Sequence, residues 1–281
     1  MKNKLNIFLN KKILIYGLGK SGFSAFNFLK NKSDVYIYDD FFLKKEDIKI
    51  KKYFIKYKNI QNKKFDKIII SPGIDINNCK LSKFLKKNLE KIHSDLDVFH
   101  SFFKNDCITI TGTNGKSTTC KLLYDVFLDQ KLDVKLVGNF GNPILSAKKI
   151  KKNTIFIIEA SSYQLQYSKN FTSKYAAILN ISPDHIERHR TINEYVDTKF
   201  KILRFQTNKH FAFVKKKDFL SQKYIKSNKI RSKIIKVDTK ITSSYFKNVS
   251  NNKLLSETNK LNLSFVLEIS KNFNLKSSLL L

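Results

Sequence analysis

Glycine and proline are rare in this chain, and their positions constrain its fold more than any other feature. The 281 residues include eight glycines and three prolines, whereas average usage would give about 20 and about 14. All eleven lie in five strings: GLGKSG (17–22), SPGI (71–74), TGTNGKST (111–118), GNFGNP (138–143) and SPDH (182–185). Because glycine reaches backbone conformations closed to other residues and proline fixes φ, these strings predict five sites of demanding backbone geometry. Collagen-like structure and Gly/Pro-rich disorder are excluded.

Positive charge dominates the composition. The chain has 54 lysines and arginines against 23 acidic residues, a formal net charge of +31, and only four of the cations are arginines. Because base-edge and bidentate phosphate recognition favour arginine, we expect weak, salt-dependent attraction to nucleic acid but no specific nucleic-acid partner.

Cysteine content and hydropathy limit the possible classes of protein further. Three cysteines exclude a disulfide scaffold, and no apolar run is long enough to predict a membrane span. The lysine-rich first residues are not followed by the apolar segment of a secretory signal peptide. The cytoplasm is therefore the expected location.

Alternating strand and helix patterns predict an α/β fold with two parallel sheets. In the first series, helical spacing at 20–30 and 81–89 alternates with apolar strands at 12–16, 35–38 and 65–70. In the second, helices at 117–128 and 192–203 accompany strands at 107–110, 134–137, 154–158, 176–181, 211–214 and 233–237. A polar stretch at 101–106 lies between the two series, so the expected domains are residues 1–102 and 103–281.

The string GLGKSG follows an expected strand and opens an expected helix. Gly17, Gly19 and Gly22 are followed by Asp39, which ends the next strand. In the dinucleotide-binding fingerprint the glycines bring a diphosphate close to the helix N-terminus, and the acid binds a ribose hydroxyl. The pattern predicts a nucleoside diphosphate pocket, for NAD or for a UDP-linked substrate. A strand–helix turn without a ligand is the alternative.

The string TGTNGKST also joins an expected strand to an expected helix. It departs from the strict phosphate-loop pattern, because Ile110 occupies the first glycine position. Backbone amides would surround the phosphates, Lys116 would neutralise them and Ser117 would bind Mg²⁺. The residues expected at the nucleotide are Gly112, Thr113, Asn114, Gly115, Lys116, Ser117 and Thr118.

Two further polar residues come directly after expected strands. Glu159 ends the strand at 154–158, and His185 follows the strand at 176–181. Because open α/β sheets bind ligands at the carboxyl ends of their strands, we expect both residues beside the phosphate loop, completing a metal shell. The histidines without such a context are expected to be structural or exposed: His93, His100, His189 and His210.

Taken in order, GTNGKST, GNFGNP, EASSYQL and NISPDHIERH resemble the Mur ligases of peptidoglycan synthesis. The strings GLGKSG and SPGI, with Asp39, resemble the branch that adds D-glutamate to UDP-N-acetylmuramoyl-L-alanine. The resemblance implies a Rossmann-like domain for the UDP substrate and a central P-loop-type ATPase domain with a parallel sheet. It implies an ATP-dependent, ADP-forming amide ligase that activates its substrate as an acyl phosphate.

Site roles follow from the resemblance by matching position. Lys116, His185 and Lys199 are the implied catalytic residues, and Lys199 is expected to be carbamylated. Two magnesium ions are implied, with ligands from Ser117, Glu159, His185 and Lys199. Asn262 would lie at the ATP. The residues implied at the UDP-muramoyl substrate are Gly17, Gly19, Gly22, Asp39, Gly73, Asn139 and Ser161.

The chain also departs from the family pattern. The arginine that some members place after the acidic residue is Phe41 here, and a histidine before the final asparagines is replaced by Thr258. The family's third domain, which binds D-glutamate, is expected to be absent after Leu281. A separately encoded third domain is then a candidate partner, and we expect little or no activity from this chain alone. A non-catalytic module that retains the UDP and ATP pockets is the alternative function.

Overall fold

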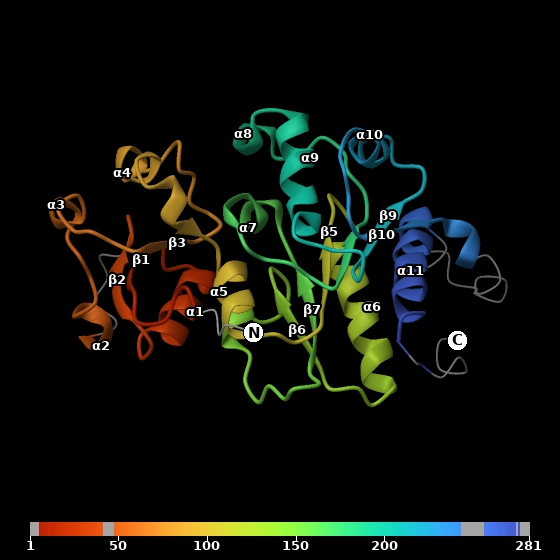
Figure 1. The fold of residues 1–281 in the computed structure, drawn as a ribbon, viewed down its shortest axis with the longest axis horizontal. Helices are drawn as coiled ribbons and strands as arrows, with labels where there is room; N and C mark the ends of the chain where they lie inside the picture. Colours follow the sequence, from red (N-terminus) through yellow and green to blue (C-terminus); the bar gives the residue numbers. More distant parts are fainter. Residues whose placement is uncertain (1–5, 42–47, 243–255, 274, 276–281) are drawn as a thin grey trace. The chain divides into compact units, whose positions relative to one another are not determined.

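The chain folds into two units, each built on its own parallel sheet (Figure 1). The computed structural model describes residues 6–41, 48–242, 256–273 and 275. The first unit comprises Met1–Lys104, Pro143–Ser146 and Tyr163–Phe171, and the second comprises Asn105–Asn142, Ala147–Ser162 and Thr172–Leu281. Two short segments of the later chain thus belong to the first unit, which no local sequence pattern indicates.

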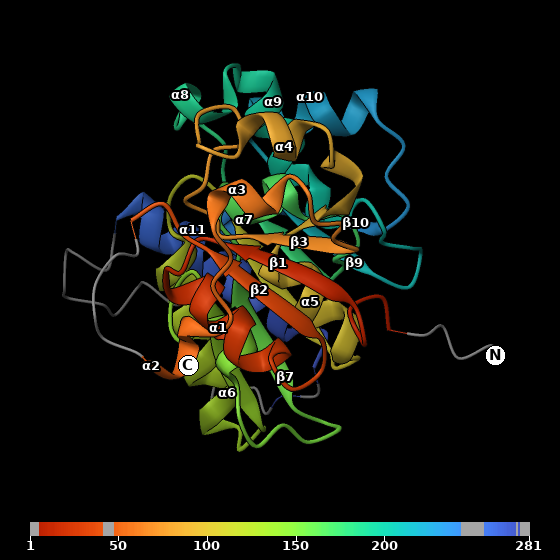
Figure 2. The same ribbon diagram turned by 90° about the vertical axis from the view of Figure 1, so that its left-hand side faces the viewer.

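The first unit has a four-stranded sheet in the order β2-β1-β3-β4, with every pairing parallel. Figure 2 shows β2, β1 and β3 side by side. The strands are β1 (Lys12–Tyr16), β2 (Asp34–Tyr38), β3 (Lys67–Ile70) and β4 (Ile92–His93). The helices are α1 (Lys20–Leu29), α2 (Ile48–Lys51), α3 (Tyr57–Ile60), α4 (Ser82–Lys86), η1 (Leu89–Lys91), α5 (Asp95–Phe102) and η2 (Ile144–Ser146). The central strand β1 is buried from Ile13 to Tyr16 and leads directly into GLGKSG.

The second unit has a six-stranded parallel sheet in the order β10-β9-β8-β5-β7-β6. Its strands are β5 (Cys107–Thr111), β6 (Val134–Gly138), β7 (Ile155–Glu159), β8 (Tyr175–Ile178), β9 (Phe211–Lys215) and β10 (Lys233–Val237). Its helices are α6 (Lys116–Asp129), α8 (Ile186–His189), α9 (Ile192–Phe200), η3 (Lys201–Leu203), α10 (Phe219–Ser227), η4 (Thr239–Thr242) and α11 (Glu257–Ser270). Helix α7 (Ser162–Tyr167) begins in this unit and continues in the first.

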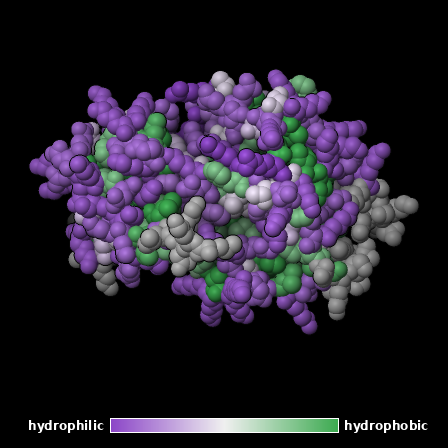
Figure 3. Space-filling view, in the orientation of Figure 1, coloured by the Kyte–Doolittle hydropathy of each residue, from purple (hydrophilic) through white to green (hydrophobic). Residues whose placement is uncertain are grey.

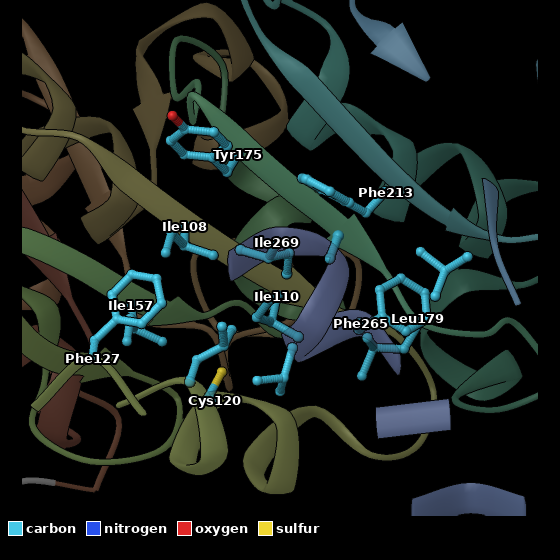
Figure 4. Close-up of a cluster of buried hydrophobic side chains, with 14 of the residues drawn as sticks. Ile108, Ile110, Cys120, Phe127, Ile157, Tyr175, Leu179, Phe213, Phe265 and Ile269 are labelled. Atoms are coloured by element: carbon cyan, nitrogen blue, oxygen red, sulfur yellow. The ribbon is translucent and has the colours of Figure 1, made fainter. Parts of the chain in front are cut away.

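The core of the second unit lies between the sheet and helices α6 and α11 (Figure 4). Ile108 and Ile110 of β5 contact a cluster to which α6 contributes Phe127 and α11 contributes Phe265. All four side chains are fully buried. Burial of a large apolar side chain stabilises a fold by about 1.5–3 kcal/mol. The sheet thus holds α6, and with it the preceding loop, in a fixed position.

The fold class predicted from the sequence is confirmed, while several element boundaries differ. The strand expected at 176–181 ends at Ile178: Leu179 still donates to Thr111 at the end of β5, whereas Asn180 accepts from Thr113 in the loop beyond it. The helix expected over 192–203 continues as the 3₁₀ turn η3 after Phe200. The helix expected over 81–89 is divided into α4 and η1.

Helices α5, α7, α10 and α11 and the short strand β4 lie outside the elements expected from the sequence. Polar residues bond two of these missed segments, α5 and α7, to distant parts of the chain. In α5, the buried Asp97 accepts backbone N–H bonds from Lys169, Asn170 and Phe171, over 70 residues away. Local periodicity cannot report such long-range bonds, because it records only which side chains share a face.

Among the described residues, no helix is long and apolar enough to cross a bilayer. The face drawn in Figure 3 is mostly hydrophilic, in keeping with the excess of lysine.

The packing of α11 can be tested by truncating one side chain. Phe265→Ala removes a fully buried ring, so we expect a loss of about 3–5 kcal/mol in the free energy of unfolding. Phe219→Ala is the matched control, because Phe219 is 78% exposed and surface changes usually stay within about 0.5 kcal/mol. Urea unfolding measures both. Equal stability of the two variants would contradict the position of α11 in this core.

Candidate active site

The loop between β5 and α6 has the form of a phosphate-binding turn. Gly115 has a φ of +84° and precedes the first residue of α6. A Cβ at this position would lie 2.3 Å from Oδ1 of Asn262, so only glycine fits. The first amides of a helix have no acceptor within the helix and point at whatever binds the N-terminus. The loop can therefore surround an anion.

Asn180 holds this loop in shape from the end of β8. Its backbone oxygen accepts the N–H of Thr113 at 2.9 Å, and its side-chain oxygen accepts the N–H of Asn114 at 2.9 Å. Its side-chain amide donates to the Asn114 oxygen at 3.0 Å. The sequence did not single out Asn180, because its role depends on the register between two strands.

Lys116 lies against the loop that precedes it. Its Nζ donates to the backbone oxygens of Gly112 at 2.9 Å and Thr113 at 2.7 Å. Burial lowers the pKa of this ammonium, while the negative charges of Glu159 and Asp184 act in the opposite direction. The cation that was expected at the phosphates is thus held on the phosphate loop.

A buried carboxylate at the end of β7 connects the start of α6 to the loop after β6. Glu159 ends β7 and is 1% exposed. Its Oε2 accepts the hydroxyl of Ser117 at 2.7 Å, and its Oε1 accepts the side-chain amide of Asn139 at 2.8 Å. Three residues that the sequence assigned to metal or substrate, from α6, β7 and the loop after β6, therefore meet at one point.

This cluster supplies suitable ligands for magnesium. A hydroxyl and a carboxylate beside a phosphate loop match the oxygen donors that Mg²⁺ prefers, and Mg²⁺ commonly takes its other ligands from phosphates and water. Within the described residues there is no group of three or more His, Cys, Asp and Glu side chains that could hold a metal by themselves. Ser117 and Glu159 thus fit a metal that binds together with a nucleotide.

Lys199 lies deep beside the same loop. It is 1% exposed, and its Nζ donates to the Gly112 oxygen at 2.8 Å. The ammonium also lies 4.4 Å from the centre of the Tyr195 ring. Burial, together with the nearby positive charge of Lys116, lowers the pKa of Lys199 to about 7. Near neutral pH, a larger fraction of this group is therefore a neutral, nucleophilic amine than in an ordinary lysine.

Two residues that the sequence did not assign to the site complete the surroundings of Lys199. The buried Tyr195 has its hydroxyl 3.2 Å from Thr113 Oγ1 of the phosphate loop. The buried His189 has Nε2 3.1 Å from the hydroxyl of Ser162 and its ring 5.2 Å from that of Tyr195. Burial and the neighbouring cations lower the pKa of His189 to about 4, so the ring is neutral. Tyr195 precedes Lys199 by four residues on α9, a spacing that could have revealed it.

His185, an expected metal ligand, lies at the edge of this group. Its backbone is left-handed, with φ +53°, and its side chain is 41% exposed. The ring nitrogens lie 3.5 Å from Asp184 and 3.7 Å from Glu187, and the ring centre lies 6.4 Å from that of Tyr195. His185 thus follows β8 at the same end of the sheet as the phosphate loop.

A cavity of about 670 Å³ opens next to the phosphate loop. Its wall includes Asn114 and Asn180 from the loop region and Leu261 from α11. Nearby, Oδ1 of Asn262 is buried and has no hydrogen-bond partner among the described residues. An acceptor in this state favours a ligand that brings a donor to it. The cavity is large enough for a nucleotide.

The glycines of GLGKSG in the first unit differ in what requires a glycine at each position. Gly17 has a φ of +89°, and a Cβ on Gly22 would lie 1.8 Å from the Gly17 oxygen. Both positions therefore require glycine for the turn itself. A Cβ on Gly19 or Gly73 would have no atom within 4 Å. The space above these two glycines is open, and at Gly19 the fingerprint predicts a diphosphate there.

Two acidic residues follow β2 beside this loop. The Asp39 carboxylate accepts the N–H of Leu18 at 2.6 Å and the N–H of Phe41 at 2.9 Å. The Asp40 carboxylate accepts the Tyr16 hydroxyl at 2.5 Å, and its other oxygen is buried without a partner among the described residues. Asp39 is thus partly used in shaping the loop, whereas Asp40 retains a free acceptor.

Ser161 and Thr118, two other expected site residues, lie beside the cluster in the chain. Ser161 is half-buried between Glu159 and the start of α7, and Thr118 is exposed in the first turn of α6.

The phosphate loop, the carboxylate cluster and the buried lysine are the features expected of an α/β ligase that binds a nucleoside triphosphate. The chain belongs to the Mur ligase family. The Mur ligase middle domain matches residues 110–280. The Mur ligase MurD-like, N-terminal domain matches residues 11–93. The family resemblance inferred from the sequence is thereby confirmed.

Named relatives of the chain include two enzymes that share one name. UDP-N-acetylmuramoylalanine–D-glutamate ligase of Rickettsia bellii is 37% identical over 202 residues, which cover 70% of this chain and 44% of that protein. The enzyme of the same name from Elusimicrobium minutum is 37% identical over 234 residues, which cover 76% of this chain and 50% of that protein. The chain therefore spans about half the length of the curated relatives it matches.

Solved structures support the fold alone. The UDP-N-acetylmuramate:L-alanyl-gamma-D-glutamyl-meso-diaminopimelate ligase from Neisseria meningitides aligns with a TM-score of 0.60 at 13% identity, over 95% of this chain and 94% of that chain. A murein peptide ligase from Psychrobacter arcticus aligns with a TM-score of 0.57 at 12% identity, over 95% of this chain and 66% of that chain.

The different roles of Gly19 and Gly22 can be distinguished by measuring the stability of an alanine variant of each. Gly22→Ala places a Cβ against a backbone oxygen, and we expect it to destabilise the first unit by about 1–3 kcal/mol or more. Gly19→Ala has open space and an ordinary φ of −62°, so its stability should match that of the unmodified chain. Chemical unfolding followed by circular dichroism compares them. A stable Gly22→Ala variant would contradict this loop geometry.

Proposed function

We propose that this chain carries the UDP-substrate and ATP sites of an ADP-forming ligase that joins D-glutamate to UDP-N-acetylmuramoyl-L-alanine. The observation that carries the proposal is the meeting of Ser117, Glu159 and Asn139 beside a phosphate loop, in a chain whose relatives have that activity in their names.

ATP is assigned to the second unit. Its phosphates would lie on the amides that open α6, with Lys116 released from the loop oxygens to neutralise them. The nucleoside would occupy the cavity next to Asn114 and Asn180. The free oxygen of Asn262 lies beside Gly115 of the adjoining loop, where it could accept a hydrogen bond from the nucleotide. Magnesium, held by Ser117 and Glu159, would neutralise phosphate charge. A second magnesium, which the resemblance implies, would use His185 and Lys199.

The reaction consists of two displacements. A carboxylate oxygen of the muramoyl-alanine substrate bonds to the γ-phosphorus while the bond to ADP breaks, which gives an acyl phosphate and ADP. The amine of D-glutamate then bonds to the acyl carbon, loses a proton and displaces phosphate. Residues of this chain would act by holding the substrate carboxylate in line with the phosphate and by stabilising charge, the two largest contributions available for such a step.

Lys199 is suited to carbamylation. Its neutral amine can add to CO₂, which forms an N–C bond and releases one proton, and the product is an anion in place of a cation. The lowered pKa and the proximity of Lys116 both favour this change, because two buried cations repel each other. The resulting carboxylate would be a ligand that magnesium accepts.

The UDP end of the substrate is assigned to the first unit. The open space above Gly19 and Gly73 can accept a diphosphate at the N-terminus of α1. Asp39 and the free oxygen of Asp40 are acceptors for hydroxyl or N–H groups of the nucleoside. Asn139 and Ser161 would contact the muramoyl end.

Substrate class can be tested by thermal shift. UDP-N-acetylmuramoyl-L-alanine should raise the melting temperature of the chain, whereas NAD⁺ should not, because a bound ligand stabilises the folded state. Gly19→Val is the matched variant: it fills the open space above the loop and should lose the shift. A rise with NAD⁺ alone would contradict the proposal in favour of an oxidoreductase.

Carbamylation can be tested by ¹³C NMR after addition of ¹³C-bicarbonate. We expect a carbamate signal that grows between about pH 6 and about pH 8, because the amine must be neutral to react and its pKa is about 7. Lys199→Arg should remove the signal, and the exposed Lys121→Arg should retain it. A signal of equal size in both variants would contradict the assignment.

A further inference from the structure

A second cavity, of about 600 Å³, lies in the second unit away from the phosphate loop. Its wall is formed by the end of α9 with η3, by α10 and by the loop before β10. Residues 203–206 and 228–231 of this wall precede β9 and β10, so they lie toward the amino ends of these strands. The phosphate loop follows the carboxyl end of β5. The two cavities have no lining residue in common.

The charges around this cavity are unusual for the chain. Arg204 and Arg231, two of the four arginines among 281 residues, both line it. Lys201 and Lys229 are also in its wall, with Asp197 as the acidic member. Within the described part of the chain, no carboxylate lies within ion-pair distance of either arginine. Lysine is common throughout this protein, but paired arginines point to bidentate binding of phosphate or carboxylate.

Aromatic rings lie next to these arginines. Phe200 and Tyr224 stack with their centres 3.9 Å apart at 22°. Phe205 is 44% exposed, and the Arg204 guanidinium lies 5.4 Å from its ring centre. An exposed ring beside a guanidinium is a surface on which a flat base can stack.

The oxygen of a buried side-chain amide in the same wall also lacks a hydrogen-bond partner among the described residues. Gln206 is 1% exposed and its Nε2 donates to the backbone oxygens of Ser173 and Phe211, which fixes the orientation of the amide. Its Oε1 has no hydrogen-bond partner among the described residues. A buried acceptor left free next to a cavity favours a ligand that carries a donor.

We propose that this cavity binds a second nucleotide, with its phosphate on Arg204 and Arg231 and its base stacked on Phe205. The size of the cavity is within the range of pockets for ligands of this size. The proposal does not depend on the ligase reaction, because it uses none of the residues assigned to the UDP substrate or to ATP.

The scarcity of arginine provides a direct test. In the chain labelled with ¹⁵N-arginine, four side-chain Nε–H signals report on Arg188, Arg190, Arg204 and Arg231, and Arg→Lys variants assign them. Titration with AMP at constant ionic strength should shift the Arg204 and Arg231 signals to saturation. Arg188 lies in α8 and Arg190 directly follows this helix. Both therefore report on the ATP side of the sheet.

Three comparisons make the result decisive. Arg204→Lys keeps the charge but loses the planar fork, and it should weaken AMP binding at Arg231 at least about tenfold. Lys236→Gln, a surface change on β10, should leave the binding unchanged. Inorganic phosphate should bind more weakly than AMP, and equal binding would overturn the assignment of the base to Phe205. Shifts that do not saturate, or that follow ionic strength alone, would overturn the site.

Discussion

The carboxylate of Glu159 is the interaction on which the rest of the candidate site depends. A buried carboxylate is tolerated only when its oxygens are bonded, since the cost of removing it from water is otherwise large. Here Ser117 at the start of α6 and Asn139 after β6 each donate to one oxygen. Hydrogen bonds to a charged group contribute about 1.5–3 kcal/mol each. They hold α6, the proposed phosphate-binding helix, in register with β6 and β7, so the loop geometry and the proposed metal ligands share one cause.

Lys199 provides the complementary constraint from the other side of the phosphate loop. Gly112 accepts hydrogen bonds from both Lys116 and Lys199, so two lysine amino groups converge on one backbone oxygen and repel each other whenever both are charged. That arrangement is unfavourable without an anion between them or near them. A nucleotide, a carbamate or both would remove the repulsion. The protein thus has a region where binding of negative charge is favourable before any ligand-specific contact is made.

The sequence predicted the parts of this account that depend on local geometry. Rare glycines marked the turns correctly, because residues such as Gly17 and Gly115 occupy left-handed backbone conformations that most other residues avoid. Glu159 and His185 could be placed at the carboxyl edge of the sheet, because each comes at or after the end of an expected strand. The sequence could not indicate that Asn180 and Tyr195 contact the phosphate loop, because these contacts join residues 66 and 82 positions apart. His189 was expected to be structural or exposed; it is buried, and it lies against Ser162 and the Tyr195 ring.

The central claim is that Glu159 provides the negative charge that couples magnesium to ATP binding in the second unit. Titration calorimetry of ATP into the chain, with and without Mg²⁺, measures this coupling most directly. The account predicts that Mg²⁺ tightens ATP binding in the unmodified chain and that Glu159→Gln, which is similar in size but uncharged, binds ATP without responding to Mg²⁺. A Glu159→Gln variant that retains the full response to Mg²⁺ would contradict the claim.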